Sequence, residues 1–153
     1  MDRVDRAILY HLQEDGRLPN VELAERVRLS PSPCLRRVKA LETAGVIAGY
    51  HAEIDPAAVG RGFQVIVHAW LSQNVRPIVE AFEAGVAQLD EVVECLRMFG
   101  EPDYLIRVAV ADQDAYEGFL INKLGALPGL TRMTSQITMK TVKAGRRLLP
   151  GPQ

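Results

Sequence analysis

The sequence has few of the residues that build metal and redox sites. Its 153 residues include two cysteines, Cys34 and Cys95, in no CxxC pair, and three scattered histidines. Because zinc and related metals need clustered Cys and His ligands, no metal site is predicted. We expect both cysteines to be small buried side chains. The sequence also has no nucleophile and base pair and no phosphate-binding glycine loop, so no enzyme is predicted.

Long apolar runs and an excess of one charge are missing too. No run approaches the roughly 20 apolar residues of a membrane helix, and the start MDRVDRAI has no secretory hydrophobic region, so we expect a cytoplasmic protein with no membrane partner. Lysines and arginines number 18 against 19 acids. Bulk charge therefore does not favour nucleic acid, and DNA binding would need local segregation of charge and two or more copies acting together.

Residues 20–39, NVELAERVRLSPSPCLRRVK, have the pattern of two short helices joined by a tight turn. Asn20 is expected to cap the first helix. Ser30 followed by Pro31 is typical of an N-cap and first helical position, so the second helix should run to about Ala44, where Gly45 stops it. The first helix has an apolar face formed by Val21, Leu23, Ala24 and Val27. A preceding helix from Asp2 to near Gly16 completes a three-helix unit.

The second of these helices has one face for packing and one with donors. Cys34, Val38 and Leu41, with Leu35 at the edge, lie opposite Ser32, Arg36, Lys39 and Thr43. Five cations lie between residues 26 and 39 with no acid among them, which suits a groove flanked by phosphates. The predicted DNA-binding residues are Arg26, Arg28, Ser30, Ser32, Arg36, Arg37 and Lys39.

Within this set we expect two roles. Ser32, Arg36 and Lys39 should face the groove, while Arg37 and either Arg26 or Arg28 should lie nearer the phosphates. The alternative is a solvated basic face on a small helical fold. Arg28 occupies a turn position that glycine often takes, and an arginine at positive φ would cost about 1 kcal/mol.

After residue 50 the pattern changes from helical to alternating. Residues 45–54 favour a short strand that Asp55-Pro56 ends. The order beyond is β-α-β-β-α-β, the ferredoxin-like arrangement, so the fold class is α+β. Strands are predicted at 62–71, 91–99, 103–111 and 131–142, and helices at 75–89 and 113–127. The predicted divisions are a helix-turn-helix domain at 1–50, a linker at 51–61, the ferredoxin-like domain at 62–143 and a loose tail at 144–153.

Both helices of the second domain have a single apolar stripe, so both should cover the same side of the sheet. The other side would carry Ile66 and Trp70 among His68, Arg107 and Gln136. This face is too apolar in places to face water, so we expect two copies to pair through their sheets as a symmetric dimer.

The motifs, in this order, resemble the Lrp/AsnC family of bacterial and archaeal transcription regulators. The matching segments are DRVDRAIL, the DGR turn, NVELAERVRLSPSPCLRRVKALE, AGVIAGY, the GEPDYLIRV hairpin, LPGL and MKTVK. The resemblance implies a DNA-binding regulator that forms dimers through its C-terminal sheets and further tetramers or octamers. It also implies a small-molecule effector, usually an amino acid, bound at an interface between dimers, and no other cofactor.

In the family, the aspartate of the glycine-and-aspartate hairpin lies close to the ammonium group of the ligand, which places Asp103 there. An acid beside a glycine turn offers partners for a zwitterion, although Gly100 and Asp103 could equally just shape the hairpin. The effector residues implied are Arg97, Met98, Gly100, Glu101, Pro102, Asp103, Tyr104, Gln113, Thr134, Ser135, Gln136, Ile137 and Thr138.

Arg97, Gln113 and Gln136 are polar where leucine-sensing relatives are apolar. Buried donors left unpaired cost roughly 1–3 kcal/mol each, so we expect a polar or charged effector rather than leucine. A second hypothesis keeps DNA binding without an effector, as an architectural protein that bends or wraps DNA. Activation or repression, the operator, the target genes and the size of the oligomer beyond a dimer do not follow from the residues.

Overall fold

The computed structural model describes residues 1–143, which form two compact units, residues 1–53 and residues 54–142. The predicted tail at 144–153 lies outside the described residues. None of the helices in the described part of the chain is long and apolar enough to cross a membrane. The same residues contain no group of three or more His, Cys, Asp or Glu side chains that could hold a metal ion.

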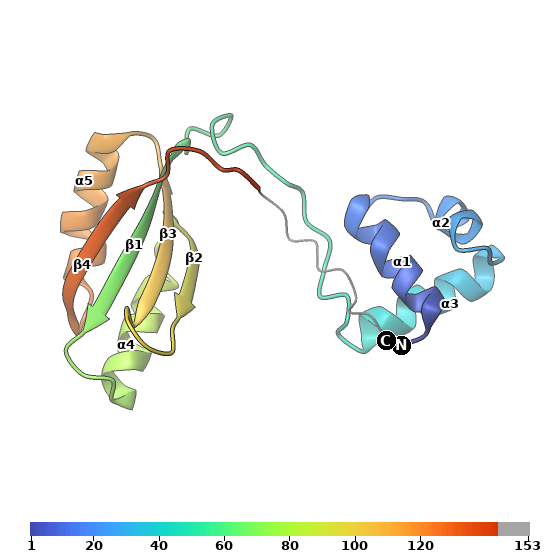
Figure 1. Ribbon diagram of the computed structural model, residues 1–153, viewed down its shortest axis with the longest axis horizontal. Helices are drawn as coiled ribbons and strands as arrows, with labels where there is room; N and C mark the ends of the chain where they lie inside the picture. Colours follow the sequence, from blue (N-terminus) through green and yellow to red (C-terminus); the bar gives the residue numbers. More distant parts are fainter. Residues whose placement is uncertain (144–153) are drawn as a thin grey trace. The chain divides into compact units, whose positions relative to one another are not determined.

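The first unit consists of three helices: α1 (Arg3–Glu14), α2 (Asn20–Arg26) and α3 (Pro31–Thr43) (Figure 1). Asp2 caps α1, accepting hydrogen bonds from two backbone N–H groups, while Asp5 accepts from the Asp2 N–H in return, a reciprocal capping box. Fully or almost fully buried side chains from all three helices form the core, among them Ile8, Leu23, Ala24 and Cys34. The predicted helix-turn-helix fold is confirmed.

Three local predictions in this unit are wrong. Asn20 is the first residue of α2 rather than its cap, and its side-chain amide donates to the carbonyl of Pro31 at 2.9 Å, which ties the starts of α2 and α3 together. Val21 lies outside the apolar face, with 56% of its surface exposed. The described residues between Ala44 and Gly62 form no strand, because no neighbouring strand lies beside them to complete a hydrogen-bond ladder.

The second unit is a four-stranded antiparallel sheet with two α-helices (Figure 1). In chain order the elements are β1 (Phe63–Leu71), α4 (Arg76–Val86), β2 (Val92–Arg97), β3 (Tyr104–Val110), α5 (Gln113–Asn122), the 3₁₀ turn η1 (Leu124–Ala126) and β4 (Leu130–Ile137). The strand order is β2-β3-β1-β4, with the first and last strands of the unit adjacent to each other. This is the predicted ferredoxin-like arrangement.

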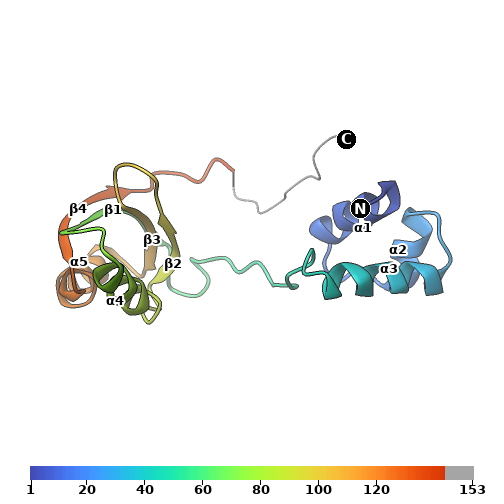
Figure 2. The same ribbon diagram turned by 90° about the horizontal axis from the view of Figure 1, so that it is seen from below.

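Both helices cover the same side of the sheet, as Figure 2 shows. On β1, Val65, Val67 and Ala69 are fully buried and face the helices, where Phe82 of α4 and Phe119 of α5 pack in the same core. Each residue between them points to the other, more open side. Alternation along one strand therefore assigns each residue of β1 to the core or to the open face.

Two element ends differ from the predictions. The strand expected to continue to residue 142 ends at Ile137, because β1 begins at Phe63 and the last ladder bond joins the Thr138 N–H to the Gln64 carbonyl. The helix expected to reach residue 127 ends at Asn122 and is followed by η1. A Cβ at Gly125 would lie 2.8 Å from the Leu120 carbonyl oxygen, so this tight turn requires glycine.

Candidate nucleic-acid interface and ligand site

The turn between α2 and α3 fixes how the second helix of the pair is presented. The Leu29 N–H donates to the carbonyl of Ala24 and the Arg28 N–H to that of Glu25, the two bonds of a Schellman motif. This motif needs its closing residue in the left-handed region, and Arg28 is there with φ of 57°. The tight turn is thus formed by an arginine at the position that usually favours glycine.

The predicted DNA-reading residues lie together on one exposed face of α3. Ser32, Arg36 and Lys39 are all exposed, whereas Cys34 is fully buried and Leu41 is 7% exposed on the opposite side. Within residues 1–143, none of the ion pairs involves Arg36 or Lys39. The face therefore carries two cations that the described protein does not neutralise.

The residues that flank this face differ in the contacts that their side chains make within the described protein. Arg28 is exposed, and no ion pair within the described residues involves it. Arg26 is exposed and stands 4.0 Å from Glu22 on the same helix, at a distance where an exposed pair contributes little. Ser30 takes the extended N-cap conformation before α3, but its side chain makes no capping bond.

Arg37, which is predicted from the sequence to lie near phosphates, is paired with acidic side chains within the chain. Its Nη1 donates to Asp5 Oδ1 and to Asp2 Oδ2, both at 2.7 Å, so the guanidinium joins α3 to the start of α1. These bonds, first the one to Asp5, raise the pKa of Arg37. Since its charge is already matched by two carboxylates, we leave Arg37 out of the proposed set of DNA contacts.

Asp103, the residue expected beside a ligand ammonium, is engaged within the chain. Its two carboxylate oxygens accept from the Leu71 N–H at 2.8 Å and from the Asn74 side-chain amide at 2.6 Å. Its own carbonyl accepts from the Met98 N–H across the hairpin. Asp103 therefore joins the β2–β3 hairpin to the loop between β1 and α4, which gives it a structural role whether or not a ligand binds.

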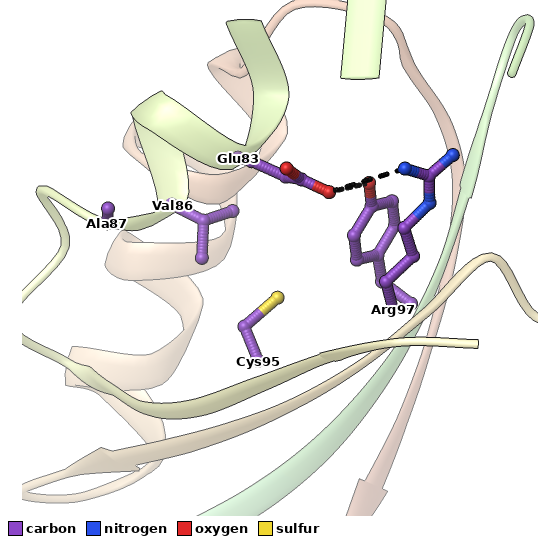
Figure 3. Close-up of a pocket in the computed structure, with 6 residues that line it drawn as sticks. Glu83, Val86, Ala87, Cys95 and Arg97 are labelled. Carbon is purple, nitrogen blue, oxygen red and sulfur yellow. Dashed lines mark hydrogen bonds and ion pairs between the residues drawn. The ribbon is translucent and has the colours of Figure 1, made fainter. Parts of the chain in front are cut away.

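A small cavity lies next to this hairpin, between α4 and β2 (Figure 3). It measures about 230 Å³. The Tyr104 hydroxyl donates to Glu83 Oε1 at 2.7 Å, and Arg97 Nη1 lies 3.9 Å from the same oxygen. The walls are formed by Glu83, Val86, Ala87, Cys95, Arg97 and Tyr104. One side of the cavity is thus apolar, and the other carries a hydrogen-bonded acid and a cation.

Two pKa shifts describe the chemistry of this cavity. Burial raises the pKa of the Cys95 thiol to about 11, and nearby Glu83 adds to the shift, so the thiol is protonated and unreactive at neutral pH. Burial, followed by the bond to Glu83, also raises the pKa of Tyr104. Both groups stay neutral at physiological pH, which favours a binding or packing role over nucleophilic chemistry.

A second cavity, of about 370 Å³, adjoins the first across the Glu83 and Arg97 side chains. Its other lining residues are Asn74, Arg76, Val79 and Glu80. Asn74 is the residue whose amide binds Asp103, so this cavity borders the loop that the hairpin holds. Neither Asn74 nor Glu83 was identified from the sequence, because nothing in the pattern of either residue marks it as facing the hairpin.

The remaining predicted effector residues begin near the hairpin and continue away from it: Thr134 pairs with His68 of β1, and the segment 134–138 then runs toward the far end of β4. The register pairs Ala69 with Tyr104 at the hairpin end, but Val65 with Ile137 near the opposite end. With about 3.3 Å per residue, the four steps from Ala69 to Val65 span roughly 13 Å, whereas Thr134, opposite His68, lies one step from the level of Tyr104. One chain therefore does not bring the hairpin group, at 97–104, together with Gln113 and with residues 136–138 of the 134–138 group. Gln136 in addition points to the open face, so no common polar lining exists within a single chain.

Comparison with known proteins gives two family matches that together cover most of the chain. Residues 1–48 match a winged helix-turn-helix DNA-binding family, and residues 64–148 match the Lrp/AsnC ligand binding domain. The chain is 42% identical over 149 residues to the leucine-responsive regulatory protein of Salmonella typhimurium, covering 97% of this chain and 91% of that protein. The Escherichia coli K12 protein of the same name is 41% identical over the same coverage.

Solved structures give the same relationship. A transcriptional regulator from Neisseria meningitidis, crystallised as a complex with L-Met, superposes with a TM-score of 0.92 at 39% identity over 97% of this chain and 96% of that chain. An AsnC family regulator from Agrobacterium tumefaciens gives a TM-score of 0.91 at 36% identity over the same shares of both chains. Both domains of the fold are therefore found, in the same order, in solved relatives.

Proposed function

The chain belongs to the Lrp/AsnC family of transcription regulators, and we propose that it reads DNA with the Ser32, Arg36 and Lys39 face of α3 and responds to an amino acid. It is a DNA-binding regulator with a ligand-binding domain and not an enzyme. The ligand-binding domain favours an effector-responsive regulator over the architectural alternative. Cytoplasmic residence stays a prediction.

The observation that carries the DNA-reading proposal is the division of α3 into two faces. Cys34 and Leu41 anchor one side in the core, while Ser32 and Arg36 project from the other. A helix placed by such a turn fits the major groove, where arginine binds guanine through two hydrogen bonds. We therefore assign Arg36 and Lys39 to base edges or adjacent phosphates, and Arg26 and Arg28 to the flanking backbone.

Replacing Arg36 by alanine tests this assignment. The probes are a duplex selected from a random pool by the wild-type protein and a random-sequence duplex of equal length. We expect the variant to lose about 1–3 kcal/mol of discrimination between them. Arg76→Ala is the matched control, since Arg76 is an exposed arginine, 86% accessible, of the other unit. If Arg36→Ala discriminated between the two duplexes as well as the wild type does, the assignment of this face would be refuted.

For the effector, we propose an amino acid bound where the hairpin of one copy meets the 134–138 group of another. In one chain Gln136 pairs with Ile66 on the open face of the sheet, whereas Arg97 lines the cavity beneath α4, so a site that uses both needs two chains. Arg97 offers a cation to a ligand carboxylate, and the Gly100 turn offers backbone donors. The relative from Neisseria meningitidis was crystallised with L-Met, which supports the chemical class.

Calorimetry with the twenty amino acids identifies the effector. The predicted preference for a polar effector assumes that Arg97, Gln113 and Gln136 line one pocket. They can do so only if the pocket is shared between copies. Binding of branched aliphatic amino acids alone would reject the preference for a polar effector. Gly100→Val tests the hairpin, because Gly100 has φ of 115°, which a β-branched residue does not adopt without strain. We expect this variant to lose binding while Ile121→Ala, an exposed control on α5, retains it.

For the assembly, we propose a homodimer through the open faces of two sheets, able to associate further. Ile66 and Trp70 are only half-buried there, and Arg132 lies 4.4 Å from the Trp70 ring centre. Sedimentation of wild type and Ile66→Glu tests this: we expect a dimer or larger species, and dissociation in the variant.

A further inference from the structure

Arg37 lies next to Arg36 on the DNA-reading helix, yet its charge is directed into the protein. One nitrogen, Nη1, donates to carboxylates of both Asp2 and Asp5 at 2.7 Å. The Asp5 side chain is 17% exposed and that of Arg37 36%. The contact is therefore partly shielded from water, unlike the wider Arg26–Glu22 pair on the neighbouring helix.

The two acids also have a second role that holds them in place. Asp2 Oδ1 accepts from the N–H groups of Val4 and Asp5, and Asp5 Oδ2 accepts from the Asp2 N–H. The bond from the Asp5 N–H, followed by the contact with Arg37, keeps the pKa of Asp2 below its usual value. The cap of α1 thus fixes both carboxylates, and the remaining oxygen of each is aimed at Arg37.

The position of Arg37 makes this arrangement relevant to DNA. Counting 100° per residue, Arg37 lies 100° from Arg36, on the side of α3 that faces α1. In helix-turn-helix proteins the reading helix lies between two phosphate backbones, so a long side chain on its flank is within reach of one of them. A released guanidinium there would bind phosphate irrespective of sequence.

We propose that Asp2 and Asp5 are positioning residues for DNA selectivity: they withhold Arg37 from the phosphates, so that it adds nothing to sequence-independent binding. The proposal rests on the DNA-reading face proposed above. Withholding one cation lowers affinity for all DNA, but it leaves a larger share of the binding energy to residues that contact bases. The α1 cap is thereby part of the device that distinguishes operator from other DNA.

The test measures how salt affects binding of the full-length protein to a random-sequence 40-base-pair duplex. The variant is Asp2→Asn with Asp5→Asn, in which the amide oxygens can still cap α1. We expect random-sequence affinity to rise roughly five- to tenfold at 0.1 M salt, and the slope of log affinity against log salt to steepen by about 0.9 per DNA-binding head. Selectivity for a duplex selected by the wild-type protein should fall.

Arg37→Gln provides the matched background. Alone, it should leave random-sequence affinity within twofold and the salt slope unchanged, because the cation is already withheld. Adding the two asparagines to Arg37→Gln should then steepen the slope no further. This comparison separates release of Arg37 from the simple removal of two negative charges near DNA.

Three results would overturn the proposal. A shallower slope in Arg37→Gln alone would mean that Arg37 contacts phosphate in the complex. An equal steepening in the Arg37→Gln background would assign the effect to the acids themselves. Weaker binding to both duplexes in the asparagine variant would leave the pair a structural role only. If thermal unfolding shows that the asparagine variant does not fold, the salt slope of Arg37→Gln alone decides whether the proposal holds. The discrimination of Arg36→Ala between the two duplexes is measured separately. A wrong assignment of the DNA-reading face can therefore be told apart from a wrong assignment of Asp2 and Asp5.

Discussion

Replacing Arg28 by glycine should stabilise the DNA-binding unit while weakening its binding to DNA. Arg28 has φ of 57° in the turn between α2 and α3. A left-handed conformation costs a residue with a Cβ about 1–2 kcal/mol, and the extra freedom of glycine in the unfolded chain offsets about 0.5–1 kcal/mol of this gain. The net stabilisation should be about 0.5–1 kcal/mol, which corresponds to roughly 2–6 °C in the unfolding temperature.

The chain offers an internal reference for this measurement. Its single tryptophan, Trp70, lies on β1 of the second unit, so its fluorescence follows that unit, whereas the helical circular dichroism signal also follows α1 to α3. We expect Arg28→Gly to raise the circular dichroism transition and leave the Trp70 transition in place. Arg28→Ala is the control, because alanine removes the same charge but keeps the strained φ.

The two variants separate strain from charge. Both should lose the same phosphate contact, with a salt slope shallower by about 0.9 per DNA-binding head. Only the glycine variant should be more stable than wild type. Equal unfolding temperatures for the glycine and alanine variants would refute the assignment of strain to this turn, and an unchanged salt slope in both would remove Arg28 from the DNA contacts.

The remaining predictions concern the hairpin, the core and one phenol. Asp103→Ala should cost about 1–3 kcal/mol in urea unfolding, because two donors lose their acceptor, and Asp103→Asn should cost less. Phe82→Ala, at a fully buried site, should cost about 3–5 kcal/mol by Trp70 fluorescence, against almost nothing for Val93→Ala at a half-exposed position. Burial and then the bond to Glu42 raise the pKa of Tyr50 to about 12. The protonated phenol therefore stabilises the fold below about pH 10, and this contribution is lost as the pH rises from about 10 to about 12. Phenolate absorbance should show one fewer group titrating near pH 12 in Tyr50→Phe, and an unchanged titration would contradict this.

The fold followed from the sequence wherever burial has a clear period. Val65, Val67 and Ala69 alternate with half-buried neighbours, and Cys34 and Leu41 lie two turns apart on one side of a helix. Such patterns depend only on the geometry of one element and on a core on one side. The α2–α3 turn was also predictable, since its position follows from Ser30-Pro31.

What could not be predicted depends on the register between elements. Nothing in residues 2–5 indicates that their carboxylates meet Arg37, because the contact requires knowing how α1 packs against α3. Residues 45–54 have a strand composition, but a strand also needs a neighbour, and composition does not supply one. The effector residues were assigned by resemblance to one pocket, and only the pairing of β1 with β3 and β4 shows that Gln136 and Ile137 are separated from the hairpin.

That separation has a genetic consequence. If a pocket takes its hairpin from one chain and its 134–138 segment from another, two chains that are each damaged in a different one of these segments can complement each other. Co-expression of a Gly100 variant with a Gln136 variant would then rebuild a fraction of intact pockets from two inactive proteins, whereas either variant alone would rebuild none. The response to effector would also weaken on dilution of the protein, because each pocket is lost when the two chains that form it dissociate.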